Sequence, residues 1–227
     1  MSEALDRPVW SALTTEQAGL AVASGAAVRI DPAYGPFAAA RDRSDAAQQA
    51  LADLLSGPED RIGLVEREAW PVPPGTQVLG GGDVVQMVFE GKAPRAPDDP
   101  RIKRLGERDA KAMAALAHAT EPGPWGSKTH RYGDFYGIRI GRKLASMAGE
   151  RLRLPGLAEL SGVSTWPEFR GQGLAATLTR RVVRGFLERG DTPFLHCYAA
   201  NVGAIALYEK LGFRTRARLT FTILALA

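Results

Sequence analysis

The chain has 227 residues, of which 45% are hydrophobic and 24% charged, with a formal net charge of +4. This composition is typical of a globular protein with a sizeable core, and the mild positive charge suits an anionic ligand without requiring nucleic acid. Cys197 is the only cysteine, which excludes an intramolecular disulfide, and the histidines show no metal-ligand spacing. Residues 1–8 do not resemble a signal peptide, and no run of ~18 apolar residues exists. We therefore expect a cytoplasmic protein without membrane contact or a bound metal.

In the first half, cap residues and apolar periodicity indicate short elements. Thr14 and Gln17 form a capping-box pattern that predicts a helix over residues 14–25. Ser44 precedes apolar residues at helical spacing, which predicts a second helix over residues 46–55. Runs rich in apolar and β-branched residues predict strands at residues 28–30, 62–65 and 84–89.

Two segments interrupt this pattern. Residues 80–82 are all glycine, and because no Lys-Ser or Lys-Thr pair follows them, they indicate a mobile turn and not a phosphate loop. Residues 91–100 contain three prolines, several charges and no large apolar side chain, which is typical of a linker. We therefore expect a smaller α/β domain of unclear role at residues 1–100 and a second domain at residues 101–227.

The second half alternates strands and helices. We expect strands over residues 101–105, 135–140, 143–153, 157–165, 193–198 and 218–225. We expect helices over residues 109–119, 174–189 and 202–211. Several strands followed by strand–helix–strand–helix–strand predict a mixed α/β sheet flanked by helices.

The most informative segment is residues 162–175, where a strand end runs through Gly171 and Gly173 into a helix. Apolar residues repeat every four positions along this helix, at Leu174, Leu178, Val182 and Phe186. The helix is therefore amphipathic and packs on a sheet. Its first N–H groups have no internal partner, so together with the helix dipole they form an anion site. A Gly-x-Gly turn also occurs without any ligand, so this pattern does not decide the function alone.

A second segment lies at the next strand end. Residues 196–201 close a strand, and Asn201 is a favourable N-cap for the helix that follows. Gly212 suits the position just after that helix. Asn201 and Tyr208 are about two helical turns apart, so they lie on nearly the same face.

The two segments together resemble the GCN5-related N-acetyltransferases, in particular the group called FR47-like. The family's Arg/Gln-x-x-Gly-x-Gly/Ala motif matches Arg170, Gly173 and Ala175. Its strand–Asn–helix element matches residues 195–213, where Leu-Tyr-Glu-Lys-Leu-Gly-Phe at residues 207–213 is intact. The resemblance covers the second half of the chain and implies a mixed, mainly antiparallel sheet with two splayed parallel strands.

The resemblance also implies acetyl-coenzyme A as the co-substrate, held between the splayed strands. Main-chain groups of Val163, Ser164 and Thr165 would pair with the pantetheine arm. The pyrophosphate would be held by N–H groups of the turn and first helical residues, namely Arg170, Gly171, Gln172, Gly173, Leu174, Ala175 and Ala176. Asn201 matches the family's asparagine that touches the cofactor arm, and it can cap its helix at the same time.

The catalytic groups are likewise implied by the resemblance. Tyr208 matches the tyrosine proposed to protonate the departing thiolate, although a phenol with a pKa near ~10 is a weaker acid than a thiol at ~8.5 and needs a tuned, dry site. His196 occupies a position where some members carry a glutamate thought to act as the base. Glu159 and Glu121, the latter through water, are alternatives. Cys197 points away from His196 by strand alternation and is interpreted as a core residue.

We therefore expect an N-acetyltransferase in which a primary amine attacks the thioester directly and the oxyanion meets a backbone N–H such as that of Val163. The alternative is a non-catalytic acyl-coenzyme A-binding or sensing module that uses residues 1–100 as a partner surface. The loop at residues 121–126 is expected to border the acceptor cleft, with aromatic and histidine side chains nearby: Trp125, Phe135 or Tyr136, Tyr132 and His130. The acceptor, a small molecule or a peptide, stays open. By analogy with the family, the chain could form a homodimer.

Overall fold

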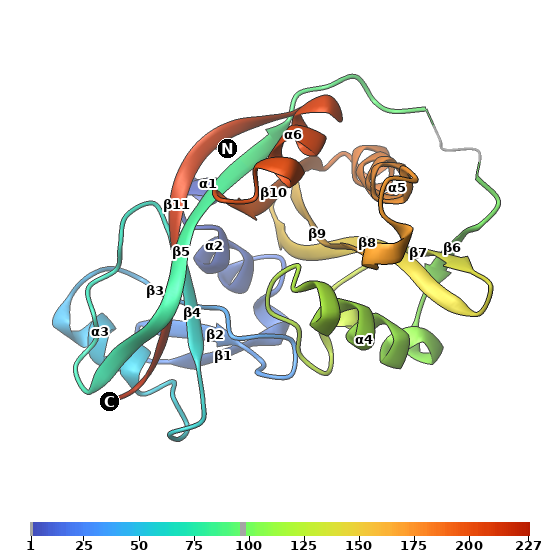
Figure 1. Cartoon of the computed structure of the whole chain (residues 1–227). Coiled ribbons are helices and arrows are strands. Elements are labelled where there is room, and N and C mark those ends of the chain that lie inside the picture. The colour runs from blue at the N-terminus through green and yellow to red at the C-terminus, as the bar shows by residue number, and fades with distance from the viewer. Residues whose placement is uncertain (1, 96–98) are drawn as a thin grey trace.

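An eight-stranded sheet runs through the centre of the molecule (Figure 1) in a computed structural model that describes residues 2–95 and 99–227. Its strand order is β4-β11-β5-β10-β9-β8-β7-β6. The strand bounds are β4 (Ile62–Glu66), β5 (Thr76–Phe89), β6 (Ile102–Leu105), β7 (Phe135–Ile140), β8 (Lys143–Leu154), β9 (Leu157–Thr165), β10 (Thr192–Tyr198) and β11 (Phe213–Leu226). All neighbouring pairs are antiparallel except β9 and β10, which are parallel. The predicted mixed, mainly antiparallel sheet is confirmed.

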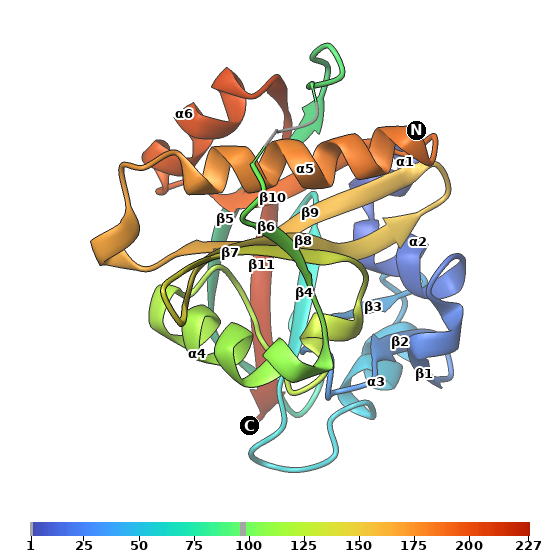
Figure 2. The same ribbon diagram turned by 90° about the vertical axis from the view of Figure 1, so that its right-hand side faces the viewer.

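Helices cover both faces of this sheet (Figure 2). The helices α5 (Leu174–Glu188) and α6 (Val202–Lys210) lie on one face, and α4 (Ala110–Thr120) lies on the other. The apolar stripe expected on α5 is buried against the sheet at Leu174, Leu178, Val182 and Phe186. Two half-buried arginines of α5 find partners within the chain: Arg184 pairs with Glu188, and Arg181 donates to the Tyr136 hydroxyl. No helix among the described residues is long and apolar enough to cross a membrane.

The first half adds three helices and a small antiparallel sheet, and Figure 2 shows α2, α3 and this sheet to the right of α4. These elements are α1 (Ser2–Asp6), α2 (Pro8–Thr14), β1 (Ala21–Ser24), β2 (Ala27–Ile30), β3 (Ala38–Ala40) and α3 (Asp45–Ala52). The expected cap of α3 is confirmed, because the Ser44 hydroxyl accepts a hydrogen bond from the Ala47 N–H. Four short 3₁₀ helices connect the described elements, and the one relevant to the site is Pro167–Phe169 in the turn before α5.

The helix predicted over residues 14–25 is wrong. Pro8 starts a helix earlier, and Thr14 lies in the last turn of α2, where its hydroxyl donates to the Trp10 carbonyl. Gln17 does not cap a helix, because its buried side chain donates to the Arg151 carbonyl on β8. Tertiary contacts thus determine the role of a residue that resembles a local helix signal.

The glycines at residues 80–82 also differ from the prediction of a mobile turn. They lie inside β5, which pairs with β11 along its whole length. A Cβ atom at Gly81 would clash with the Phe221 carbonyl oxygen on β11. Glycine therefore allows the two backbones to approach closely in the middle of a strand.

The two halves of the sequence share one sheet and one core. Strands β4 and β5, from before residue 91, pair with β11 and β10. A single buried cluster joins Leu5 and Phe37 of the first half to Leu152 and Phe194 of the second. Of the predicted linker, residues 96–98 lie outside the described part of the chain. Sheet and core both extend across residue 100, and the division into two domains there stays a prediction.

We expect Leu178→Ala to lower the free energy of unfolding by about 2–5 kcal/mol, because it leaves a cavity between α5 and the sheet. Urea denaturation measures this change. Arg180→Ala on the exposed face of the same helix is the matched control and should change stability by less than about 0.5 kcal/mol. An equally small effect of Leu178→Ala would contradict the described packing of α5.

Candidate functional site

The parallel strands β9 and β10 separate soon after they begin. They pair only from Leu157 opposite Thr192 to Glu159 opposite Phe194. Further along, β9 contains an extra residue relative to β8. Ser161 pairs with Gly149 and Ser164 pairs with Met147, so a step of three residues on β9 faces a step of two on β8. Gly162 allows this bulge with a φ of 62°, and a Cβ atom there would lie 2.8 Å from the Phe135 ring. Residues 163–165 therefore present an edge with which no strand among the described residues pairs.

The turn before α5 leaves the start of that helix open. Gly171 and Gly173 have φ values of 79° and 73°, a left-handed conformation that glycine adopts without strain. Gly173 is the N-cap of α5, and it has no side chain that could bond the first-turn N–H groups. These N–H groups and the positive end of the helix dipole face the same opening as the free edge of β9.

A groove of about 470 Å³ joins these features, a size within the range of small-molecule sites. The structure brings together in its lining ten of the residues predicted to bind the cofactor: Val163, Ser164, Thr165, Arg170, Gly171, Gly173, Leu174, Ala175, Ala176 and Asn201. Gln172 is exposed on the same turn and does not line the groove. The Arg170 Nε atom lies 3.4 Å from the Thr165 carbonyl oxygen, which keeps the guanidinium beside the groove.

Asn201 and Tyr208 lie on the wall formed by α6. The Asn201 side-chain oxygen accepts a hydrogen bond from the Ala204 N–H, so Asn201 caps the helix as predicted. Tyr208 is buried against Phe213 and Cys197, and its burial raises the pKa of the phenol. Burial likewise raises the pKa of the Cys197 thiol, which belongs to the core packed under α5. Both groups are therefore protonated at neutral pH.

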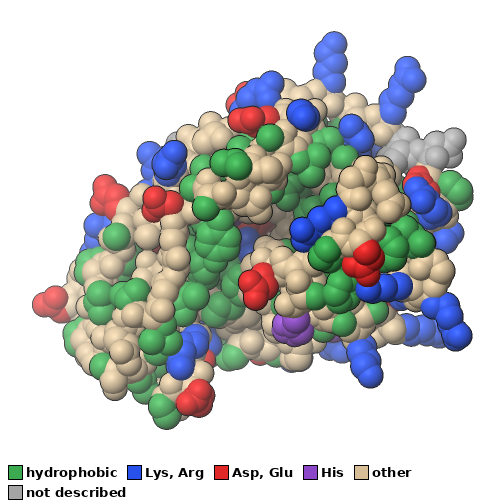
Figure 3. Space-filling view, viewed as in Figure 1, with side chains coloured by type: hydrophobic (Ala, Val, Ile, Leu, Met, Phe, Trp, Pro, Cys, Tyr) green, Lys and Arg blue, Asp and Glu red, His purple; other side chains and the backbone are tan. Residues whose placement is uncertain are grey.

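A second, smaller cavity of about 130 Å³ continues inward from the groove. The two hollows share part of their lining, including Glu121, Val163, Asn201 and Tyr208. We call the inner cavity the acceptor pocket. Its far walls are mostly apolar and come from both halves of the chain, at Phe37, Val65, Val84, Leu160 and Phe221. The face that carries it is hollowed near its centre, where hydrophobic side chains gather (Figure 3).

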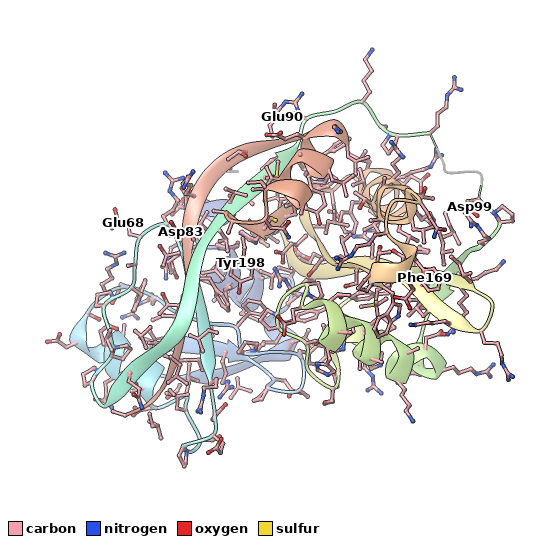
Figure 4. All side chains as sticks on the ribbon, in the orientation of Figure 1. Glu68, Asp83, Glu90, Asp99, Phe169 and Tyr198 are labelled. Carbon is pink, nitrogen blue, oxygen red and sulfur yellow. The ribbon has the colours of Figure 1, made fainter. Side chains whose placement is uncertain are left out.

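Tyr198 stands at the border of this pocket. It ends β10, lies 6.5 Å from Phe221 between ring centroids and is partly exposed. Figure 4 shows it between β5 and the loop that follows α4, and the same view shows Phe169 on the turn that precedes α5. Phe169 lines the groove, and Tyr198 lines the acceptor pocket. In Figure 4 these two labels therefore locate the two hollows of the site.

A buried network of charges lies at the inner end of the acceptor pocket. Arg151 donates from Nε and Nη2 to the Glu159 carboxylate at 2.8 and 2.6 Å, and the Leu152 N–H donates to the same group. Burial alone would raise the pKa of Glu159, but Arg151 and His196 outweigh it and lower the pKa to about 2. Glu159 is therefore ionised and fully paired, which leaves it no role as a free base.

His196 is held by partners on both ring nitrogens. Its Nδ1 atom lies 2.7 Å from a Glu159 oxygen, so Nδ1 carries a proton and donates. Its Nε2 atom lies 3.0 Å from the Gln86 amide nitrogen, which also donates to the Leu5 carbonyl. The Gln86 oxygen accepts from Arg216, which assigns the orientation of that amide. In this arrangement Nε2 accepts a hydrogen bond, so Gln86 must move before His196 can take a proton from a substrate.

Glu121 lies where the groove and the acceptor pocket meet. It is the residue after α4, and because Pro122 follows, the helix ends there. Its φ of 46° makes it the one non-glycine residue with a positive φ in the described ranges 2–95 and 99–227. Such a conformation costs of order 1–3 kcal/mol and concentrates at functional sites. No described residue forms an ion pair with its carboxylate.

The other residues expected near the acceptor lie elsewhere. Trp125 packs edge-to-face on Phe135, and neither ring lines the acceptor pocket. The loop at residues 121–124 does line it, as expected. Residues that the sequence reasoning missed are Phe37, Val65, Val84, Arg151 and Phe221. No short motif contains them, because pairing between distant strands brings them together.

No group of three or more His, Cys, Asp or Glu side chains within the described part of the chain could hold a metal ion. The site therefore consists of a groove with open main-chain donors, a buried phenol, an unpaired carboxylate and a small inner pocket. This arrangement can hold an elongated anionic ligand with one end against a second, smaller molecule.

Comparisons with known proteins agree with this arrangement. A family model described as FR47-like protein matches residues 135–222. The crystal structure of a GNAT-family protein from Novosphingobium aromaticivorans is 55% identical, covers 98% of each chain and superposes with a TM-score of 0.92. The ribosomal protein bS18-alanine N-acetyltransferase of Escherichia coli K12 is 32% identical over 119 residues, which are 49% of this chain and 79% of that protein. A GCN5-related N-acetyltransferase from Kribbella flavida, at 20% identity and a TM-score of 0.63, shares the fold.

The lowered pKa of Glu159 predicts acid sensitivity. A depressed carboxylate pKa contributes stability above the unfolded value of 4.5, and that contribution is lost as the pH falls toward about 2. We expect Glu159→Gln to lower the free energy of unfolding at pH 7 by about 3–5 kcal/mol, because Arg151 loses its partner. Denaturation curves between pH 7 and pH 2.5 should show a shallower decline for the variant. An equal slope in both proteins would show that Glu159 does not carry this dependence.

Proposed function

Because the chain belongs to the GCN5-related N-acetyltransferase (GNAT) family and is an acetyltransferase, we propose that it transfers an acetyl group from acetyl-coenzyme A to a primary amine by direct attack. The observation that carries the proposal is the groove that joins the uncapped start of α5 to Tyr208. The acceptor pocket opens from the same place, so donor and acceptor can meet there.

The residues of the groove fit coenzyme A. First-turn N–H groups of α5 suit the pyrophosphate, which needs several donors and tolerates no side chain between them and the anion. The free edge at residues 163–165 offers main-chain groups to the amide-bearing pantetheine arm, and Asn201 also lines the groove. When bound, acetyl-coenzyme A supplies the activated thioester, and the Val163 N–H is our candidate donor to its carbonyl oxygen.

Tyr208 is the proposed acid. Its side chain is buried and lines both cavities, and the phenol is protonated at neutral pH because burial raises its pKa. A protonated phenol can donate to the departing thiolate. The raised pKa makes that donation less favourable at equilibrium, so exclusion of water and close contact must offset it.

The proton of the incoming ammonium needs an acceptor, since only a neutral amine can attack. We propose Glu121 for this role, directly or through one water, because its carboxylate is unpaired and lies at the junction. His196, the base expected from the resemblance, then becomes a positioning residue that holds Glu159 and the strand β10 in place. Assigning the base to Glu121 or to His196 predicts different losses of activity when each residue is substituted.

The size of the acceptor pocket favours a small amine. The related Escherichia coli enzyme is an acetyltransferase for an alanine of ribosomal protein bS18. The acceptor pocket of this chain is only about 130 Å³ in volume, and side chains from the first half of the sequence form part of its lining. We therefore propose a small-molecule amine in preference to a peptide.

Tyr208→Phe is expected to reduce kcat by about 10²–10⁴-fold, because the variant cannot protonate the thiolate. Binding of coenzyme A, measured by calorimetry, should be unchanged. Tyr132→Phe is the matched control, because Tyr132 is also buried but lines neither cavity. Thiol release from acetyl-coenzyme A with a panel of primary amines reports turnover. If the wild-type protein binds no coenzyme A and releases no thiol with any amine, the proposed function is wrong.

The base is assigned by a pair of variants. Glu121→Gln should lower kcat/KM by about 10²–10⁴-fold, because the variant cannot accept the proton of the ammonium. His196→Gln should lose less activity, because glutamine can still donate to Glu159. The opposite pattern, in which His196→Gln causes the larger loss of kcat/KM, would assign the base to His196.

A further inference from the structure

We propose that the amine acceptor also carries a carboxylate, which binds to the free edge of the Arg151 guanidinium, and that its body is small and apolar, as in an amino acid with an aliphatic or aromatic side chain. This inference rests on the proposed acetyl transfer. It adds the chemical class of the acceptor and the residue that recognises it.

Arg151 has one edge occupied and one edge free. The Nε–Nη2 edge binds Glu159 at 2.8 and 2.6 Å. No described residue accepts a hydrogen bond from Nη1, although Arg151 is only 9% exposed and lines the acceptor pocket. A guanidinium has five N–H donors in a planar fork, so the Nη1–Nη2 edge keeps a second pair of parallel donors.

The guanidinium is also held in a fixed plane. Its central carbon lies 4.8 Å above the Phe37 ring, and its other edge is fixed by the buried carboxylate. Nη1 is the nearest atom to the position that a Cβ at Gly123 would occupy, at 3.4 Å, so glycine leaves room beside it in the loop that borders the pocket. Such a rigid, partly desolvated fork matches a carboxylate in a planar, bidentate geometry.

Arg151, Glu159 and the neutral His196 carry no net charge together, so what attracts an anion at this place is the unused N–H donors of the Arg151 guanidinium. Glu159 is shared between Arg151 and His196, and its pKa is lowered by both. Glu121 lines both the acceptor pocket and the groove, and the loop that it begins brings Gly123 beside the Arg151 Nη1 atom. An ammonium group beside Glu121 and a carboxylate beside Arg151 would place both charges of a zwitterion next to groups of opposite charge.

The remaining walls of the acceptor pocket specify the side chain of the amino acid. They are formed by Phe37, Val65, Val84, Leu160 and Phe221, with Tyr198 at the border. Burying apolar surface there is favourable at roughly 25 cal/mol per Å². A peptide N-terminus has an amide where a free amino acid has its carboxylate, so it would not satisfy the Arg151 edge.

The experiment compares matched acceptors. L-Leucine and L-phenylalanine would each be assayed against their amides and against 3-methylbutylamine and phenethylamine, which lack the carboxylate. We expect kcat/KM for the free acids to exceed that for both neutral counterparts by about 10- to 100-fold, since a charge-assisted hydrogen-bonded pair is lost without the carboxylate. The difference should lie mainly in KM.

Two variants test the role of Arg151. Arg151→Lys keeps the charge opposite Glu159 but has no fork, and the double variant Arg151→Met with Glu159→Gln removes both charges without leaving one unpaired. Each should bring the ratio of acid to amide close to one, whereas Arg180→Lys on the exposed face of α5 should leave it unchanged. Thermal unfolding confirms that each variant is folded.

A readout that does not need turnover completes the test. N-acetyl-L-leucine should bind to the protein saturated with coenzyme A more tightly than its amide, and Arg151→Lys should remove this difference. If amines without a carboxylate are acetylated as efficiently as the acids, or if the variants keep the acid preference, this inference is wrong and the proposed acetyl transfer still stands. If no amine is acetylated and no product binds, both are wrong.

Discussion

The site depends on the limited pairing of β9 and β10. These parallel strands share hydrogen bonds only at their beginning, and they then separate because β9 carries a bulge at Gly162. A paired strand edge would leave no main-chain groups for a ligand and no path into the sheet. Residues from both strands line the groove and the acceptor pocket beyond the point of separation, so the proposed site depends on this local irregularity.

A buried network of charges lies where the two strands stop pairing. Glu159 is the last residue of β9 to pair with β10, and Arg151 from β8 and His196 from β10 meet on it. Removing one member leaves an unpaired buried charge, whereas the complete set neutralises itself. Gln86 extends the network to β5 and to the backbone of Leu5, so helix α1 is tied to the inner end of the acceptor pocket. The first half of the chain thus contributes both to stability and to the shape of the site.

Local sequence signals predicted the elements of the second half well. The strand–glycine turn–helix unit at β9 and α5, and the capped helix α6, form where expected because their signals are close in sequence: apolar spacing, Gly173 and Asn201. The first half was predicted less well. Gln17 satisfies a backbone carbonyl on β8 and does not cap a helix, and the glycines at residues 80–82 lie within β5 because β11 passes close to them. In both cases the deciding contact comes from a distant part of the chain.

The sequence by itself determined the family, the order of the motifs and most residues of the groove, since the groove is formed by backbone conformations that nearby residues specify. Only the tertiary structure decided the acceptor pocket and the partners of His196. Phe37, Val84, Arg151 and Phe221 are far apart in the chain and meet through strand pairing across the sheet. Side-chain hydrogen bonds such as those of Glu159 and Gln86 depend on that pairing and on the register of the strands. A pattern in the sequence cannot specify such contacts, because each depends on where several other segments pack.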